Sequence, residues 1–221
     1  MLIKFIIRNY ETKKSLDEYN KVKLIPIQES HRQRLLGWCN YYLGKKNLRE
    51  LKHIGNEARK AFIKVLQIGQ SRIDIDSALN GLSLVYYYLL NEPKKAFRVK
   101  EKTINKVHNK AQLLNTQGLL KRDEGQIIEA LNTFSDAYNE ARMTKDYRTS
   151  GHALNNKART LMLLFLKLEL KNELKKEILT LFEKAKIEYH EYEKSTGDSA
   201  NFHLDGIEEQ IRDLNSRYPW N

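Results

Sequence analysis

The chain has 221 residues, 41% hydrophobic and 30% charged, which gives enough apolar side chains for a core and excludes a disordered chain. The formal net charge of +11 favours acidic partners. The single Cys39 excludes an internal disulfide and favours a reducing, cytoplasmic compartment. We find no stretch with the length and apolar character of a membrane span or a signal peptide, so no membrane partner is expected.

The first segment, residues 1–27, is predicted to be a capping segment, formed either by a short helix or by an arm that docks onto the following helices. The sequence Ile-Pro-Ile at residues 25–27 ends any helix before Gln28. Leu35–Gly44 is expected to form a helix that ends in a turn at Gly44. From Leu48 to Ile68, apolar residues recur at steps of three and four, which predicts one apolar stripe along a second helix.

The middle of the chain is predicted to form two helical hairpins. Leu82–Leu90 leads into a turn at Asn91–Pro93, and a later helix containing Gly118 leads into a turn at Asp123–Gly125. Ala96 and Ala130 follow these two turns and lie about one 34-residue repeat apart. Caps for the first of these helices are expected at Asp74 or Asp76.

The last part is predicted to add another hairpin and a terminal helix. His152–Phe165 forms the first helix, and the second carries Phe182 and Ala185. The loop Ser195–Asn201 then leads into a helix near Phe202 with a polar outer face, for which Ser199 or Asn201 is the expected cap. That polar face is typical of the helix that closes an array of helical repeats.

The spacing of small and aromatic residues in the middle of the chain resembles that of the tetratricopeptide repeat family. Gly118, Ala130, Phe134 and Ala137 have the order small, Ala, aromatic, Ala, and Ser83, Tyr86 and Ala96 share part of it. The usual Trp and Pro of the pattern are absent. The resemblance implies an all-α, TPR-like solenoid of about four helical hairpins over residues 28–195, closed by a capping helix in residues 196–221.

The resemblance also implies that one face of each first helix lines a concave groove. One inward position then carries Arg34, Asn80, Asn115 and Asn155. A carboxamide donates and accepts at once, which is the chemistry needed to hold a peptide backbone. The alternative is that these asparagines bond between stacked helices. The residues expected to bind a peptide are Asn80, Asn115, Asn155, Arg34, Arg122, Arg159, Trp38, Tyr41 and Tyr87.

The histidines are scattered, and the sequence His-Glu-Tyr-Glu-Lys from His190 lacks the second histidine of a zinc motif. We therefore expect no catalytic residue, no metal site and no cofactor, and a non-enzymatic scaffold that binds an acidic protein or peptide as an adaptor, sensor or regulator. The alternative is a nucleic-acid-associated protein that uses the basic segment Lys94–Lys110. That segment lacks the interleaved aromatic residues on which single-stranded bases stack.

Overall fold

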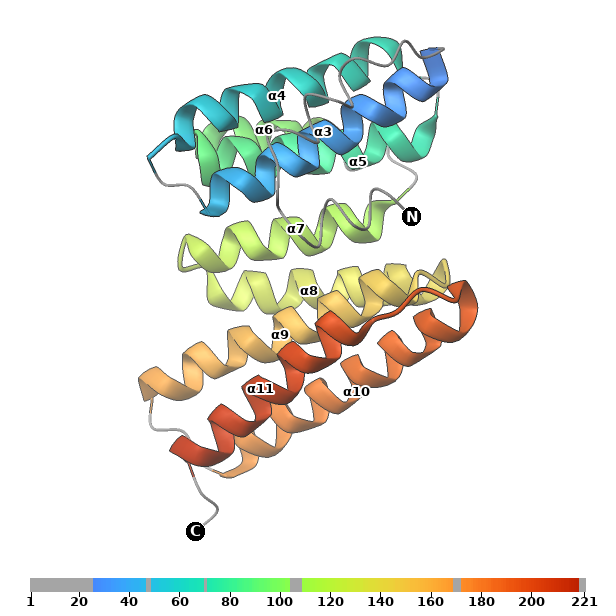
Figure 1. Ribbon diagram of the computed structural model, residues 1–221. Coiled ribbons are helices and arrows are strands. Elements are labelled where there is room, and N and C mark those ends of the chain that lie inside the picture. The colour runs from blue at the N-terminus through green and yellow to red at the C-terminus, as the bar shows by residue number, and fades with distance from the viewer. Residues whose placement is uncertain (1–25, 47–48, 70, 104–108, 169–171, 219–221) are drawn as a thin grey trace. The chain divides into compact units, whose positions relative to one another are not determined.

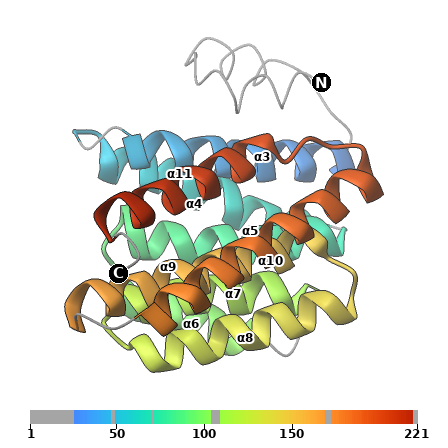
Figure 2. The ribbon, with the colours of Figure 1, turned by 90° about the horizontal axis from the view of Figure 1, so that it is seen from below.

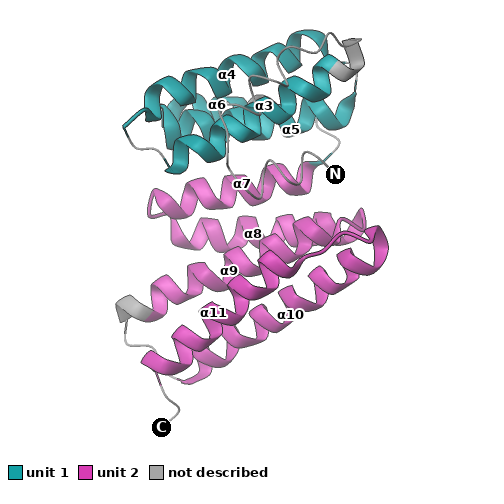
Figure 3. Ribbon diagram, viewed as in Figure 1, with its two compact units in different colours: residues 1–109 teal, residues 110–221 magenta. Residues whose placement is uncertain are grey.

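The described residues form helices and no strand, which confirms the predicted all-α class (Figure 1). The computed structural model describes residues 26–46, 49–69, 71–103, 109–168 and 172–218. The chain divides into two compact units, residues 1–109 (unit 1) and 110–221 (unit 2), which Figure 3 colours separately. The predicted capping segment, residues 1–27, lies outside the described residues except for its end, where Pro26 begins the first described helix.

Unit 1 is built from helices that follow one another along the chain, with η1 continuing α5 directly. The elements are α3 (Pro26–Lys46), α4 (Leu51–Ile68), α5 (Arg72–Leu84), the π-helical η1 (Val85–Leu89) and α6 (Pro93–Thr103). The helix α3 packs on α4, and α5 packs on α3, α4 and α6. The predicted turn before α6 is confirmed, with Asn91 in the left-handed region at φ 53°.

The fully buried ring of Phe62 on α4 forms the centre of unit 1. A Cβ atom on Gly37 of α3 would lie 2.5 Å from this ring, and one on Gly81 of α5 only 2.2 Å. Trp38 meets the same ring edge-on at 5.5 Å between centroids. Glycines at both positions therefore let two helices close onto one aromatic side chain, which follows from the close packing of protein interiors.

Two sequence-based predictions for unit 1 are wrong. Gly44 lies inside α3, where a Cβ atom would meet Leu89 at 2.8 Å, so it serves a close approach and not a turn. The cap of α5 is Ser71, whose hydroxyl accepts a hydrogen bond from the backbone N–H of Asp74. Asp74 and Asp76 lie within the helix, because the chain is already helical from Arg72 onward.

Unit 2 continues the pattern of consecutive helices. Its elements are α7 (Lys110–Asp123), α8 (Ile127–Met143), α9 (Tyr147–Leu168), α10 (Asn172–Thr196) and α11 (Asn201–Arg217). The predicted turn between α7 and α8 is confirmed, with Gly125 at φ +83°. The helices α7 and α8 lie side by side in both ribbon views, and α9 packs on α7, α8 and α10 (Figures 1 and 2).

The α7–α8 hairpin is closed by the small and aromatic residues that the sequence singled out. Ala130, Phe134 and Ala137 are fully buried. A Cβ atom on Gly118 would lie 2.5 Å from the ring of Phe134, so these two residues set how closely the helices approach. Phe182 and Ala185 of α10 are buried in a hydrophobic core with residues of α9, to which α11 contributes Ile207 and Leu214.

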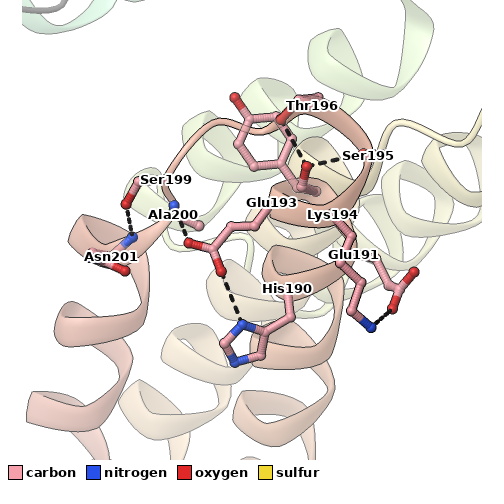
Figure 4. A network of polar contacts seen from close by, with 10 residues as sticks. His190, Glu191, Glu193, Lys194, Ser195, Thr196, Ser199, Ala200 and Asn201 are labelled. Atoms are coloured by element: carbon pink, nitrogen blue, oxygen red, sulfur yellow. Dashed lines mark hydrogen bonds and ion pairs between the residues drawn. The ribbon is translucent and has the colours of Figure 1, made fainter.

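The joint between α10 and α11 is held by a side chain from α10, as Figure 4 shows. Glu193 accepts hydrogen bonds from the backbone N–H of Ala200 at 2.7 Å and from Nδ1 of His190 at 3.1 Å. These bonds, with the backbone bond as the larger cause, lower the pKa of Glu193. The residue directly before α11 is Ala200, which makes no side-chain cap, so neither Ser199 nor Asn201 holds the predicted cap position. Ser199 nevertheless contributes to this helix start, because its hydroxyl accepts a hydrogen bond from the backbone N–H of Asn201 at 3.3 Å.

Cys39 of α3 is half-buried, and burial raises the pKa of its thiol. Because the thiolate is the reactive form, we expect a thiol reagent to label the native protein much more slowly than the chain unfolded in urea. The measurement is the labelling rate under both conditions at one mildly alkaline pH. Equal rates in the native and unfolded protein would contradict this packing of Cys39.

Candidate functional site

The residues predicted to bind a peptide are divided between the two units. Arg34, Trp38, Tyr41, Asn80 and Tyr87 belong to unit 1. Asn115, Arg122, Asn155 and Arg159 belong to unit 2, on α7 and α9. Each group is therefore considered within its own unit.

In unit 1, side chains of α3 are engaged with the first turns of α5. Nε of Arg34 lies 2.7 Å from Oδ1 of the buried Asp74, and Nε1 of Trp38 donates to Oγ of Ser77 at 2.9 Å. Tyr41 is buried in the core of the unit. Tyr87 is partly buried and meets Tyr88 edge-on at 5.0 Å between centroids. Arg34 and Trp38 thus join α3 to α5, whereas the Tyr87 contact lies within η1.

Asn80 is buried between α5 and α6, where its Oδ1 lies 3.5 Å from Nζ of Lys100. Burial also lowers the pKa of Lys100 well below its ordinary value. Lys100 belongs to the basic segment Lys94–Lys110 but contributes nothing to an exposed basic face. Within that segment Lys94 and Arg98 are exposed, and residues 104–108 lie outside the described part of the chain.

In unit 2, one hydrogen bond fixes α9 against α7. Nδ2 of Asn156 donates to Oδ1 of Asn115 at 3.0 Å, and Asn115 is buried. This is the bonding between stacked helices that the sequence left open as the alternative role of the asparagines. Asn156 itself was not singled out from the sequence, because only its neighbour Asn155 falls at the inward position of the repeat pattern.

Asn155, the next residue toward the start of α9, has a different environment. Its Oδ1 is buried, and no donor among the described residues bonds to it. A buried acceptor without a partner destabilises a protein by about 1–3 kcal/mol, so such groups call for an explanation. The residue as a whole is partly exposed, so a ligand that brings an N–H group would satisfy this oxygen once the side-chain amide turns it toward the surface.

Arginines from α7 and α9 lie close together near this asparagine. Nε and Nη2 of Arg122 both lie 2.8 Å from Oδ1 of Asp123. Partial burial lowers the pKa of Arg159, repulsion from Arg122 lowers it further, and attraction by Asp123 opposes these effects. The pair of guanidinium groups thus shares one carboxylate, which leaves an excess of positive charge.

Asn155 and Arg159 are four residues apart on α9 and so lie on the same face of the helix, one turn from each other. This places an unsatisfied acceptor next to a cation whose positive neighbour is Arg122. A ligand that offers an N–H donor beside a carboxylate fits both groups. A peptide backbone with acidic side chains has this combination.

No family model, curated protein or solved structure matches this chain. Among the helices that the structure describes, none is long and apolar enough to cross a membrane. Within the same residues there is also no group of three or more His, Cys, Asp or Glu side chains placed to hold a metal ion. The chemistry of the α7–α9 surface itself therefore carries the functional argument.

Proposed function

We propose that the protein is a non-enzymatic scaffold that holds an extended, acidic segment of a partner protein across α7 and α9 of unit 2. It would act as an adaptor, a sensor or a regulatory module in the cytoplasm. The observation that carries this proposal is the buried, unsatisfied Oδ1 of Asn155, one helical turn from Arg159. A peptide N–H bonds to Asn155, and a carboxylate of the same segment bonds to Arg159.

The packing of unit 2 supports a repeat architecture similar to that of tetratricopeptide repeats, which we include in the proposal. Successive hairpins α7–α8 and α9–α10 bring their first helices, α7 and α9, into contact. The glycine–aromatic pair Gly118 and Phe134 closes the first hairpin. In such arrays the adjoining first helices form the surface that binds an extended segment.

The charges of this surface favour an acidic ligand over a neutral one. Arg122 and Arg159 repel each other, and Asp123 offsets only part of that repulsion. A carboxylate that bonds to Arg159 relieves the repulsion, and a planar guanidinium can hold it in two parallel hydrogen bonds. A basic ligand would add to the positive charge and be rejected.

The test starts with selection of ligands for the full chain from a displayed library of random peptides, which we expect to be rich in Asp and Glu. Calorimetric titration of a selected peptide then compares variants. Asn155→Ala is expected to weaken binding by about 1–3 kcal/mol, because a peptide N–H loses its acceptor. Arg159→Glu is expected to weaken it more, because attraction becomes repulsion.

The matched control is Arg212→Glu, the same charge reversal on the exposed face of α11. We expect it to change the affinity far less than Arg159→Glu, and circular dichroism should show that all three variants remain helical. Equal effects of the two arginine reversals would indicate attraction by net charge alone. That result, or unchanged binding by Asn155→Ala, would contradict the proposal.

A further inference from the structure

One end of unit 1 gathers basic side chains from several helices. The end of α3, the start of α4 with the residues just before it, and the start of α6 meet there, next to η1. Contacts confirm the arrangement, since Nζ of Lys45 lies 5.1 Å from the centre of the Tyr88 ring and Nζ of Lys95 lies 5.8 Å from that of Tyr86. We call this region the basic end, which comprises Lys45, Lys46, Arg49, Lys52 and Lys94, all of them exposed.

Several cations of the basic end have no carboxylate partner among the described residues. Of the carboxylates in the described ranges, none lies within ion-pair distance of Arg49, Lys52 or Lys94. At the same end Lys95 is paired with Glu92 at 2.9 Å. The first turns of α4 and α6 add the positive ends of two helix dipoles to the same region.

An aromatic platform lies beside these charges. The ring of Tyr42 is 38% exposed and stacks on Trp38, with 6.0 Å between ring centroids and 30° between planes. Lys45 and Lys46 follow Tyr42 by three and four residues on α3 and therefore flank it on one helix face. The π-helical η1 adds three consecutive, partly exposed tyrosines to this end of the unit, and π-helical turns are frequent at functional sites.

We propose that the basic end binds single-stranded nucleic acid, with a base stacked on Tyr42 and phosphates bound by the surrounding lysines and Arg49. A flat aromatic ring flanked by cations matches the repeating unit of a single strand, which presents an unpaired base next to each phosphate. In a duplex the faces of the bases are already stacked on one another, so a duplex offers no free base face to stack on the Tyr42 ring. This site is independent of the α7–α9 surface of unit 2.

An acidic protein or an anionic membrane would also be attracted by the charge, but neither explains the platform. Carboxylates have no face that stacks on Tyr42. A membrane-binding surface needs several exposed apolar side chains, and Tyr42 is the large apolar side chain that the described part of the basic end exposes. The sequence suggested nucleic-acid binding through Lys94–Lys110, where Phe97 is the single Phe, Tyr or Trp among the basic residues. The fold instead brings aromatic and basic residues together from separate segments.

The experiment measures fluorescence anisotropy of labelled oligonucleotides of about 12 nucleotides, a typical length for single-strand sites, with the full chain. Oligo-dT, oligo-U and a duplex of the same length are compared over a range of salt concentrations. We expect both single strands to bind more tightly than the duplex. A plot of the logarithm of the affinity against the logarithm of the salt concentration should have a slope of about −2 to −3, as for three or four phosphate contacts.

Variants separate stacking from charge. Tyr42→Leu is expected to weaken single-strand binding about tenfold with an unchanged salt slope, and Tyr42→Phe to retain binding. The pair Lys45→Gln with Arg49→Gln should lower the magnitude of the slope by about 1.4. The matched control is Lys60→Gln with Lys64→Gln on α4, which removes the same charge away from the basic end and should leave the slope nearly unchanged.

Several results would overturn the proposal. One is equal loss of affinity in the Lys60 and Lys64 control, and another is duplex binding as tight as single-strand binding. A third is displacement of the oligonucleotide by polyglutamate, or by anionic vesicles, at equal concentration of charge, which would show a general polyanion surface. Because the charge variants alter exposed side chains, they give a result even if Tyr42→Leu disturbs folding.

Discussion

Replacing Phe62 by alanine is expected to lower the free energy of unfolding of unit 1 by about 3–5 kcal/mol. The ring is fully buried and fills the space between α3 and α5 that Gly37 and Gly81 leave open. Neither glycine has a side chain that can move into the vacated volume, so the cavity remains. Urea unfolding followed by circular dichroism measures the change.

The matched control is Phe202→Ala, the same substitution at a side chain that is 85% exposed, and we expect it to change the free energy of unfolding by less than about 0.5 kcal/mol. Gly81→Ala provides an independent check, because its Cβ atom overlaps the Phe62 ring and is expected to destabilise by about 1–3 kcal/mol. If Phe62→Ala and Phe202→Ala had equal effects, the described core of unit 1 would be wrong.

Lowering the pH from 6.5 to 4 is expected to destabilise unit 2 through His203 of α11. This ring stacks on Tyr189 of α10 at 4.9 Å and meets His152 of α9 edge-on at 4.6 Å. Burial, and then repulsion from Arg148, lower the pKa of His203 from 6.5 to about 4. The pKa of His152 is also well below its ordinary value, through burial, His203 and Arg148.

The sign follows from the lowered pKa. The folded state favours the neutral imidazole, so its contribution is fully present above pH 6.5 and is lost as the pH falls toward 4. A shift of this size corresponds to about 3 kcal/mol when fully buried, and the partial exposure of His203 reduces the expected loss to about 1–2 kcal/mol. The histidine cluster therefore makes the docking of α11 sensitive to acid.

The measurement is the free energy of unfolding in urea at neutral and acidic pH for the native protein and for His203→Gln, which cannot take up a proton there. We expect the free energy of unfolding to differ less between the two pH values in this variant than in the native protein. His53→Gln, at an exposed position of α4, is the control and should retain the full difference. A His203→Gln variant with unchanged pH dependence would show that the cluster does not titrate between these pH values.

The local part of the fold could be predicted from the sequence where the contacting residues lie within one hairpin. Gly118 and Phe134 are close in the chain, and their spacing predicts the contact that the structure contains. In the predicted repeat before this hairpin, Ser83 was expected to be the small residue at the helix contact, but Gly81 faces the Phe62 ring instead. Phe62 belongs to α4, which precedes α5 in the chain, so the contact joins two different hairpins. The π-helical turn that follows α5 also departs from the regular helical period on which the prediction relied.

The candidate site could be predicted only in part. The helical period placed Asn155 and Arg159 on one face of α9, which needs no knowledge of other helices. The bond from Asn156 to Asn115 and the burial of Lys100 beside Asn80 depend on how separate helices pack, and the spacing along the chain carries no signal for either. For the same reason, the aromatic residues of the basic end were not connected with their cations from the sequence.

The most direct test of the α7–α9 surface is an amide-resolved NMR titration of the full chain with an acidic peptide selected for binding. We predict saturable shifts centred on the residues around Asn155 of α9 and Arg122 of α7, with the carboxamide of Asn155 among the most affected signals. Shifts that saturate at the same concentration but centre on unit 1, or on the exposed face of α11, would contradict the assignment of this surface as the peptide site.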